Sequence, residues 1–357
     1  MRVFIGGLGY CGSRIAAAIH VSYPECVISG TVRSTERHDA MLASPPAWLT
    51  GNVHLLDLDD GYTGLLHNGG EDGGEGSGGI DELKSATHII QTIAPIADLD
   101  TDPLLSLHGS EIMDSDQLQY VAYLSSTGVY GDHDGEWVNE EPELKCIDAK
   151  SMARVRAEGE WMQLESGDGS DGIRVDCFRC GGIYGPGRGP LFSSMESLNA
   201  ALADDEGEAE NAGGNNENDE TQQQQRTAVP KYVNRIMVDD ICGAILASIS
   251  GERCRCGGRA YNLVDDDPAP RRAVVAEARR LLLSKDSKQP QREQRRQQDR
   301  GLETTIATKN TRRRISRATG NKRCDNTRLK EEYGWELKAL TFREGLALLL
   351  ENGDLLR

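Results

Sequence analysis

A glycine-rich segment that directly follows the first apolar run constrains the fold of this chain more than any other feature. The segment, Ile5–Gly12, joins a predicted strand, Arg2–Gly6, to a predicted Ala- and Ile-rich helix, Cys11–His20. Its glycines satisfy both GxGxxG and GxxGxxG spacing and are Gly6, Gly7, Gly9 and Gly12. Glycine permits a tight turn from strand to helix, a close approach of the backbone to a ligand, and intimate helix–sheet packing. The motif therefore predicts the first βαβ unit of a parallel sheet.

The same segment predicts a site for the pyrophosphate of a dinucleotide. The N-terminus of the helix offers free backbone N–H groups and the positive end of the helix dipole to the phosphates. Besides the glycines, we assign Leu8, Tyr10 and Cys11 to this cradle. A Gly-rich turn that serves packing alone is the alternative, but the position between a strand and a helix favours a ligand.

Apolar, β-rich runs alternate with helix-like stretches along the rest of the first half. The further predicted strands are 26–33, 52–58, 87–93, 120–125 and 173–179, with two more near 235–240 and 260–264. Strands interleaved with helices predict a parallel sheet with helices on both faces and right-handed crossovers. We therefore expect an α/β protein with a Rossmann-type, doubly wound parallel sheet.

Three polar segments do not fit this pattern. Residues 68–79 form a Gly/Glu insertion, and residues 204–226, acidic and rich in Asn and Gln, are predicted to be disordered. Residues 285–317 are Gln- and Arg-rich and are expected to be a loose basic segment.

Charge and cysteine usage exclude several classes of function. The net charge of −17 argues against binding to nucleic acid or to an anionic membrane. No apolar run approaches the roughly 18 residues of a membrane span, and a first strand at Arg2 leaves no room for a leader, so we expect a cytoplasmic protein. The nine cysteines are scattered, and Cys177 and Cys180 fall in one predicted strand on opposite faces, so no metal site is expected.

The end of the second predicted strand indicates which cofactor binds. Arg33 stands there, about twenty residues after the last glycine of the motif, where an arginine suits the 2′-phosphate of NADP. We expect NADP, with NAD possible; an ordinary surface arginine is the alternative interpretation. Asp57 and Leu58 close the third strand, where Asp57 could reach the adenine amino group. Thr92 and Ala94, around the end of the fourth strand, complete the predicted cofactor site.

Motifs spread along the whole chain, outside the polar segments, resemble one protein family. They are Tyr123–Asp132 (YLSSTGVYGD), Arg179–Arg188 (RCGGIYGPGR), Arg235–Asp240 (RIMVDD), Tyr261–Asp266 (YNLVDD), Asn326–Trp335 (NTRLKEEYGW) and Thr341–Gly345 (TFREG). In this order they resemble the extended short-chain dehydrogenase/reductases, the NAD-dependent epimerase/dehydratase family, and an atypical branch of it. The resemblance implies a Rossmann domain, residues 1–190, and a small C-terminal substrate lobe, residues 191–357, interleaved with the sheet.

The resemblance also implies catalytic positions, and one of them departs from the family. Ser126 matches the serine that hydrogen-bonds the reacting oxygen of the substrate. The Tyr-xxx-Lys pair that should follow on the next helix is missing. If Glu160 is the customary glutamate of that helix, Met152 and Arg156 occupy the pair's positions; if Glu158 is, Lys150 and Arg154 do. We assign Arg156 to cofactor binding, because an arginine keeps a positive charge for ribose hydroxyls or phosphate.

Two further residues have open interpretations. Tyr130 is the best surviving proton donor, and a structural tyrosine in the Val-Tyr-Gly turn is the alternative. Arg188 is predicted to bind an anionic group of the substrate such as a phosphate, or else to face solvent. Two functions compete: an NADP-dependent oxidoreductase or epimerase acting on a small polar, nucleotide-linked or phosphorylated substrate, and a non-catalytic NAD(P)-binding or sensing module.

Overall fold

The computed structural model describes residues 1–58, 64–65, 78–96, 101–165, 172–211, 230–251, 259–287 and 320–353. Most of the three predicted polar segments therefore lies outside the described residues. Two of these predictions began too early, because helix α6 (Met195–Asn211) covers residues 204–211 and helix α8 (Arg271–Ser287) covers residues 285–287. In the described part of the chain, no helix is both long enough and apolar enough to cross a membrane.

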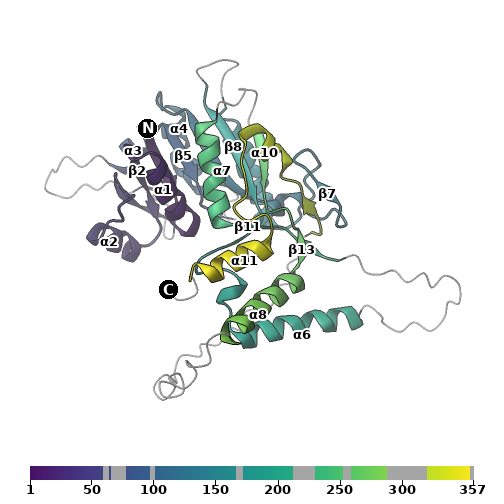
Figure 1. Ribbon diagram of the computed structural model, residues 1–357. Helices are drawn as coiled ribbons and strands as arrows, with labels where there is room; N and C mark the ends of the chain where they lie inside the picture. The colour runs from purple at the N-terminus through teal and green to yellow at the C-terminus, as the bar shows by residue number, and fades with distance from the viewer. Residues whose placement is uncertain are drawn as a thin grey trace.

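An eight-stranded sheet forms the centre of the protein, in the order β12-β8-β6-β5-β1-β2-β3-β4 (Figure 1). All pairs are parallel except β3 with β4. The strands are β1 (Arg2–Gly6), β2 (Val27–Val32), β3 (Val53–Asp57), β4 (Gly64–Leu65), β5 (His88–Gln91), β6 (Tyr120–Ser126), β8 (Arg174–Cys180) and β12 (Arg259–Leu263). The predicted doubly wound α/β class is confirmed, and the predicted strands are present within a few residues, except that the one near 235–240 is shorter and lies in a separate small sheet.

The sheet is covered on both faces, and each face has its own hydrophobic core. Helices α1 (Tyr10–Ser22) and α7 (Val238–Ser250) cover one face with Ile15, Ile19, Ile241 and Ile245. Helices α3 (Gly79–Lys84), α4 (Pro103–Met113) and α5 (Ala149–Met162) cover the other with Leu83, Leu104, Ile112 and Trp161. Cys180 belongs to the first core and Cys177 to the second, as strand alternation predicts.

The C-terminal elements pack beyond the carboxyl ends of the strands. Two small sheets lie there, β9 (Gly182–Tyr184) with β11 (Arg235–Met237) and β10 (Tyr232–Val233) with β13 (Ala269–Pro270). Helices α6, α8 and α11 (Phe342–Glu351) lie below the sheet in Figure 1, and α8 and α11 contribute side chains to a third core around Phe342. The domain boundary at residue 190 stays a prediction.

The strand predicted near residues 235–240 ends at Met237 and runs directly into a helix. Helix α7 begins at Val238, its N-cap is Met237, and no side chain caps it. Asp240 instead lies inside the first turn, where its carboxylate accepts the Lys338 N–H at 2.6 Å. The aspartate therefore ties the C-terminal segment to the helix rather than starting it.

Candidate active site

The glycine motif forms a rigid turn between β1 and α1. Gly7 has a positive φ of 90°, and a Cβ at Gly12 would overlap the Gly7 carbonyl. The Gly7 N–H donates to Thr31 Oγ1 at 2.9 Å. Thr92 Oγ1 donates to the Gly6 and Gly7 carbonyls at 3.0 and 2.8 Å. The positive φ at Gly7 and the overlap at Gly12 explain the need for glycine at these two positions by contacts within the protein.

Gly9 differs from the other glycines of the motif because no described atom of the protein occupies the space where its side chain would lie. A Cβ there would meet no described heavy atom within 4 Å, and the residue is the N-cap of α1 without a side-chain cap. The first turn of α1 carries no acidic residue. Open space in front of uncapped helix N–H groups fits an anion such as a pyrophosphate. The cradle residues thus fit the predicted dinucleotide.

Two arginines follow β2 near this cradle. Arg33 is exposed directly after the strand, and Arg37 lies one turn into α2 (Thr35–Ala43). Arg37 Nη2 donates to the Leu8 carbonyl at 2.8 Å and lies 3.4 Å from Ser13 Oγ, so its guanidinium reaches the glycine motif. The sequence motifs did not indicate Arg37, although it stands only four residues after Arg33.

The other predicted cofactor residues lie in different surroundings. The side chain of Asp57 lies outside the described structure, while Leu58 is buried in the core with Leu56 and Leu65 and does not face the cradle. Thr92 lies under the glycine motif through the bonds given above. Ala94 is exposed just beyond the carboxyl end of β5.

Ser126 ends β6 at the carboxyl edge of the sheet, the same edge as the glycine motif. It is half-buried, and its hydroxyl accepts the Gly128 N–H at 3.1 Å as the cap of the short helix η1 (Thr127–Tyr130). A Cβ at Gly128 would lie 3.4 Å from Ser126 Oγ and 3.0 Å from Ser151 Oγ. The hydroxyls of Ser126 on β6 and Ser151 on α5 therefore lie on either side of Gly128 at this edge.

Tyr130 lies in the interior and not at this edge. Its side chain is fully buried, and its hydroxyl donates to Asn262 Oδ1 at 2.8 Å and accepts from Arg179 Nη1 at 3.0 Å. Burial raises its pKa far above that of an ordinary tyrosine, although the nearby Arg179 opposes the shift. This position supports the alternative of a structural tyrosine and gives no support to Tyr130 as proton donor.

The buried face of α5 distinguishes between the two alignments of the missing pair. Glu158 is buried and accepts from Arg179 Nη2 at 2.8 Å and Nε at 3.1 Å, whereas Glu160 is half-buried and accepts from Thr101 at 3.1 Å. Lys150 and Arg154 precede Glu158 by eight and four residues and therefore lie on the same face. The alignment through Glu158 is the one that the structure supports.

The alternative residues lie on the far side of the helix. Residues two positions apart are rotated by about 200° around a helix axis. Accordingly Met152 is exposed at 41% and Arg156 is exposed, while Ser151 and Ala157 are buried. The assignment of Arg156 to the cofactor site thus finds no support, and Arg154 takes its place on the face toward the sheet.

A glycine-rich turn, Gly185–Arg188, lies against the start of α1. Its Pro186 carbonyl accepts from the Tyr10 hydroxyl and from Arg14 Nη2, both at 3.1 Å. The Arg14 and Arg188 guanidinium carbons lie 4.1 and 5.2 Å from the centre of the Tyr10 ring. Arg188 therefore lies beside the cradle, with its charge available to an anionic group there.

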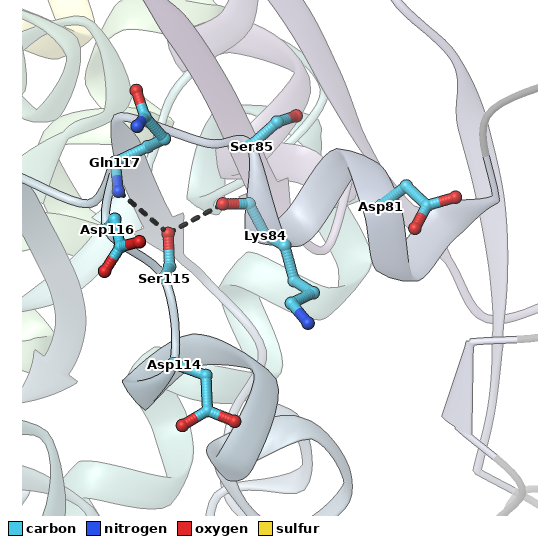
Figure 2. Close-up of a pocket in the computed structure, with 7 residues that line it drawn as sticks. All are labelled: Asp81, Lys84, Ser85, Asp114, Ser115, Asp116 and Gln117. Carbon is cyan, nitrogen blue, oxygen red and sulfur yellow. Dashed lines mark hydrogen bonds between the residues drawn. The ribbon is translucent and has the colours of Figure 1, made fainter.

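A surface hollow lies at the opposite edge of the sheet (Figure 2). It is lined by Asp81, Lys84, Ser85, Asp114, Ser115, Asp116 and Gln117, which precede β5 and β6. Ser115 Oγ donates to the Lys84 carbonyl at 2.6 Å, which joins its two walls. This hollow is separate from the glycine motif. Among the described residues, no three His, Cys, Asp or Glu side chains are grouped to hold a metal ion.

Solved structures show a fold like this one. No protein-family model and no curated protein matches the sequence. A functionally unknown conserved protein from Silicibacter pomeroyi is 27% identical, with 98% of both chains covered and a TM-score of 0.62. A proposed NAD-dependent epimerase/dehydratase from Methylobacillus flagellatus is 20% identical, with 99% of this chain and 98% of that chain covered and a TM-score of 0.55. A short-chain dehydrogenase/reductase superfamily protein from Agrobacterium tumefaciens with bound NAD is 13% identical, with 98% and 96% covered and a TM-score of 0.59.

Proposed function

Because the chain has the fold of the extended short-chain dehydrogenase/reductases, we propose that it is an NADP-dependent oxidoreductase or epimerase of a small polar substrate. One observation carries the proposal. The glycine motif keeps open space at Gly9 in front of an uncapped helix N-terminus, and Ser126 ends a strand at the same sheet edge. Ligands of open α/β sheets bind at the carboxyl ends of the strands.

The cofactor would lie between the glycine motif and the arginines after β2. The N–H groups of the first turn of α1 would bind the pyrophosphate, and Arg33 with Arg37 would bind the 2′-phosphate of the adenosine ribose. Arg154 would contribute positive charge near the carboxyl ends of β6 and β8. When bound, the nicotinamide supplies hydride transfer.

Ser126 would bind the reacting oxygen of the substrate. Its hydroxyl already accepts the Gly128 N–H, which leaves its own proton for donation to a substrate carbonyl or hydroxyl. With no tyrosine on the inward face of α5, proton exchange would pass through an ordered water or a group of the substrate itself. Arg188 would bind an anionic part of a nucleotide-linked or phosphorylated substrate.

A binding or sensing module is the second candidate function. The observation in its favour is that Lys150, which is exposed in the first turn of α5, stands in place of the phenol that the family uses for proton transfer. In such a module NADP would be a structural or sensory ligand, and Ser126 would have no substrate to bind.

Two measurements test these functions. Calorimetry should show that NADPH binds at least about ten-fold more tightly than NADH, a difference of about 1.4 kcal/mol, and that Arg33→Ala or Arg37→Ala removes most of it. Arg156→Ala, on the far side of α5, is the matched control and should keep the preference. Equal affinities would reject the assignment of NADP.

A metabolite pool incubated with the protein and NADP+ or NADPH then separates enzyme from module. Turnover should appear as a change in nicotinamide absorbance together with a product identified by mass spectrometry. Tight binding of NADPH with no product from any pool would favour the module.

A further inference from the structure

Two cations on α5 stand where the family places its tyrosine and lysine. Lys150 lies in the first turn of α5 and Arg154 one turn later, on the face that holds Glu158 two turns along. The neighbouring Ser151 is buried against Gly128, which Ser126 flanks from the other side. The first turn of α5 therefore lies at the carboxyl edge of β6, beside the proposed position of the reacting oxygen.

Neither cation forms an ion pair with a carboxylate in the described ranges of the chain, although Arg154 lies close enough to Asp148 for their charges to interact. Arg154 Nε is buried without a hydrogen bond, and neither side chain forms an ion pair with a described residue. Two carboxylates at opposite ends of the same helix have other hydrogen-bond partners. Asp148 accepts the Ser151 N–H at 3.0 Å as the N-cap, and Glu158 is bound to Arg179.

A pair of like charges four residues apart on a helix is unfavourable by a few tenths of a kcal/mol. A buried guanidinium Nε without a hydrogen bond adds a desolvation cost. Both costs are offset if an anion lies between the two side chains. An ammonium and a guanidinium together present several N–H donors to carboxylate or phosphate oxygens.

We propose that Lys150 and Arg154 bind an oxyanion of the substrate, a carboxylate or a phosphate, next to Ser126. The proposal rests on the proposed function, and it narrows the substrate class to compounds with an anionic group close to the reacting carbon. Lys150 stands where the family has the tyrosine that exchanges a proton, and its ammonium group would bind the negative charge of the substrate instead. Arg188, which lies beside the cradle, is free to bind a second anionic group.

Calorimetry on the full chain saturated with NADP+ tests the pair, with inorganic phosphate and oxalate as separate probes. Lys150→Gln and Arg154→Gln should each weaken binding of the preferred probe at least about ten-fold, and Lys150→Arg should retain it. Arg156→Gln, which removes an exposed arginine from the far side of the same helix, should leave the affinity unchanged. Binding of phosphate alone, oxalate alone or both identifies the oxyanion.

The outcomes separate this inference from the proposed function. If NADP+ binds but neither probe does, or if Lys150→Gln leaves the affinity unchanged, the oxyanion inference is wrong while the cofactor assignment stands. If NADP+ itself does not bind, the proposed function is wrong. Melting temperatures identify any variant that fails to fold. Because Lys150 is exposed, its variants should fold normally, so they still test the inference if Arg154→Gln is unstable.

Discussion

The ion pair between Glu158 and Arg179 leads to a sharp prediction, because it fixes the orientation of α5. Glu158 and Arg179 are only 3% and 5% exposed. Arg179 directs Nε and Nη2 at the carboxylate, and its Nη1 donates to the Tyr130 hydroxyl. Substitution Glu158→Ala leaves a buried guanidinium with no carboxylate.

The expected cost follows from this burial. Removal of one partner from a buried ion pair destabilises a protein by about 3–5 kcal/mol, because the remaining charge stays uncompensated. Glu160 provides the matched control on the same helix. It is half-buried and accepts one hydrogen bond from Thr101, so Glu160→Ala should cost less than about 1 kcal/mol.

Urea unfolding followed by circular dichroism measures both variants. Glu158→Ala should lower the midpoint strongly at an unchanged slope, and Glu160→Ala should move it little. Similar losses for the two variants, or a larger loss for Glu160→Ala, would refute the alignment of Lys150 and Arg154 with the family's catalytic pair.

Two further predictions concern buried polar groups. Tyr130→Phe should destabilise the protein by about 1–3 kcal/mol, since it removes the buried hydroxyl that bonds Asn262 Oδ1 and Arg179 Nη1, and it should not change NADPH affinity. A loss of turnover at full stability would restore its catalytic role. Burial raises the pKa of Glu82, but hydrogen bonds from His54 and two other side chains outweigh it and lower the pKa to about 2. This folded-state pKa lies below the unfolded value, so the carboxylate contributes about 3 kcal/mol above roughly pH 4.5, and the contribution disappears as pH falls toward 2. Between pH 7 and pH 3 the unfolding free energy of Glu82→Gln should fall less steeply than that of the wild-type protein. An identical dependence on pH for the two proteins would contradict this role of Glu82.

The sheet and the cradle could be predicted from the sequence because their signals are local. Apolar strand runs and glycines at fixed spacing are set by backbone geometry, which needs no knowledge of distant residues. The alignment of α5 could not be predicted in this way. Lys150, Arg154 and Glu158 have the same spacing as Met152, Arg156 and Glu160. The two sets are distinguished by the ion pair of Glu158 with Arg179, which lies on another strand of the sheet.

The same limit explains why the role of Tyr130 stayed open in the sequence and why Arg37 was not predicted. Tyr130 follows Ser126 closely in sequence, yet its hydroxyl donates to Asn262 on a distant strand, and this bond holds the Tyr130 side chain in the interior. Arg37 reaches back to the Leu8 carbonyl, a contact that depends on how α2 packs beside the glycine motif. In each case the partner lies far along the chain, so neither periodicity nor motif spacing indicates it.

Titration of NADPH into the wild-type protein and into Gly9→Ala by calorimetry tests whether the glycine motif binds the pyrophosphate of a dinucleotide. No described atom lies within 4 Å of the added Cβ, so the free variant should keep its melting temperature. The same methyl group would occupy the space reserved for the pyrophosphate, so NADPH affinity should fall at least about ten-fold. Equal binding of NADPH to both proteins, or no binding to the wild type, would contradict the account.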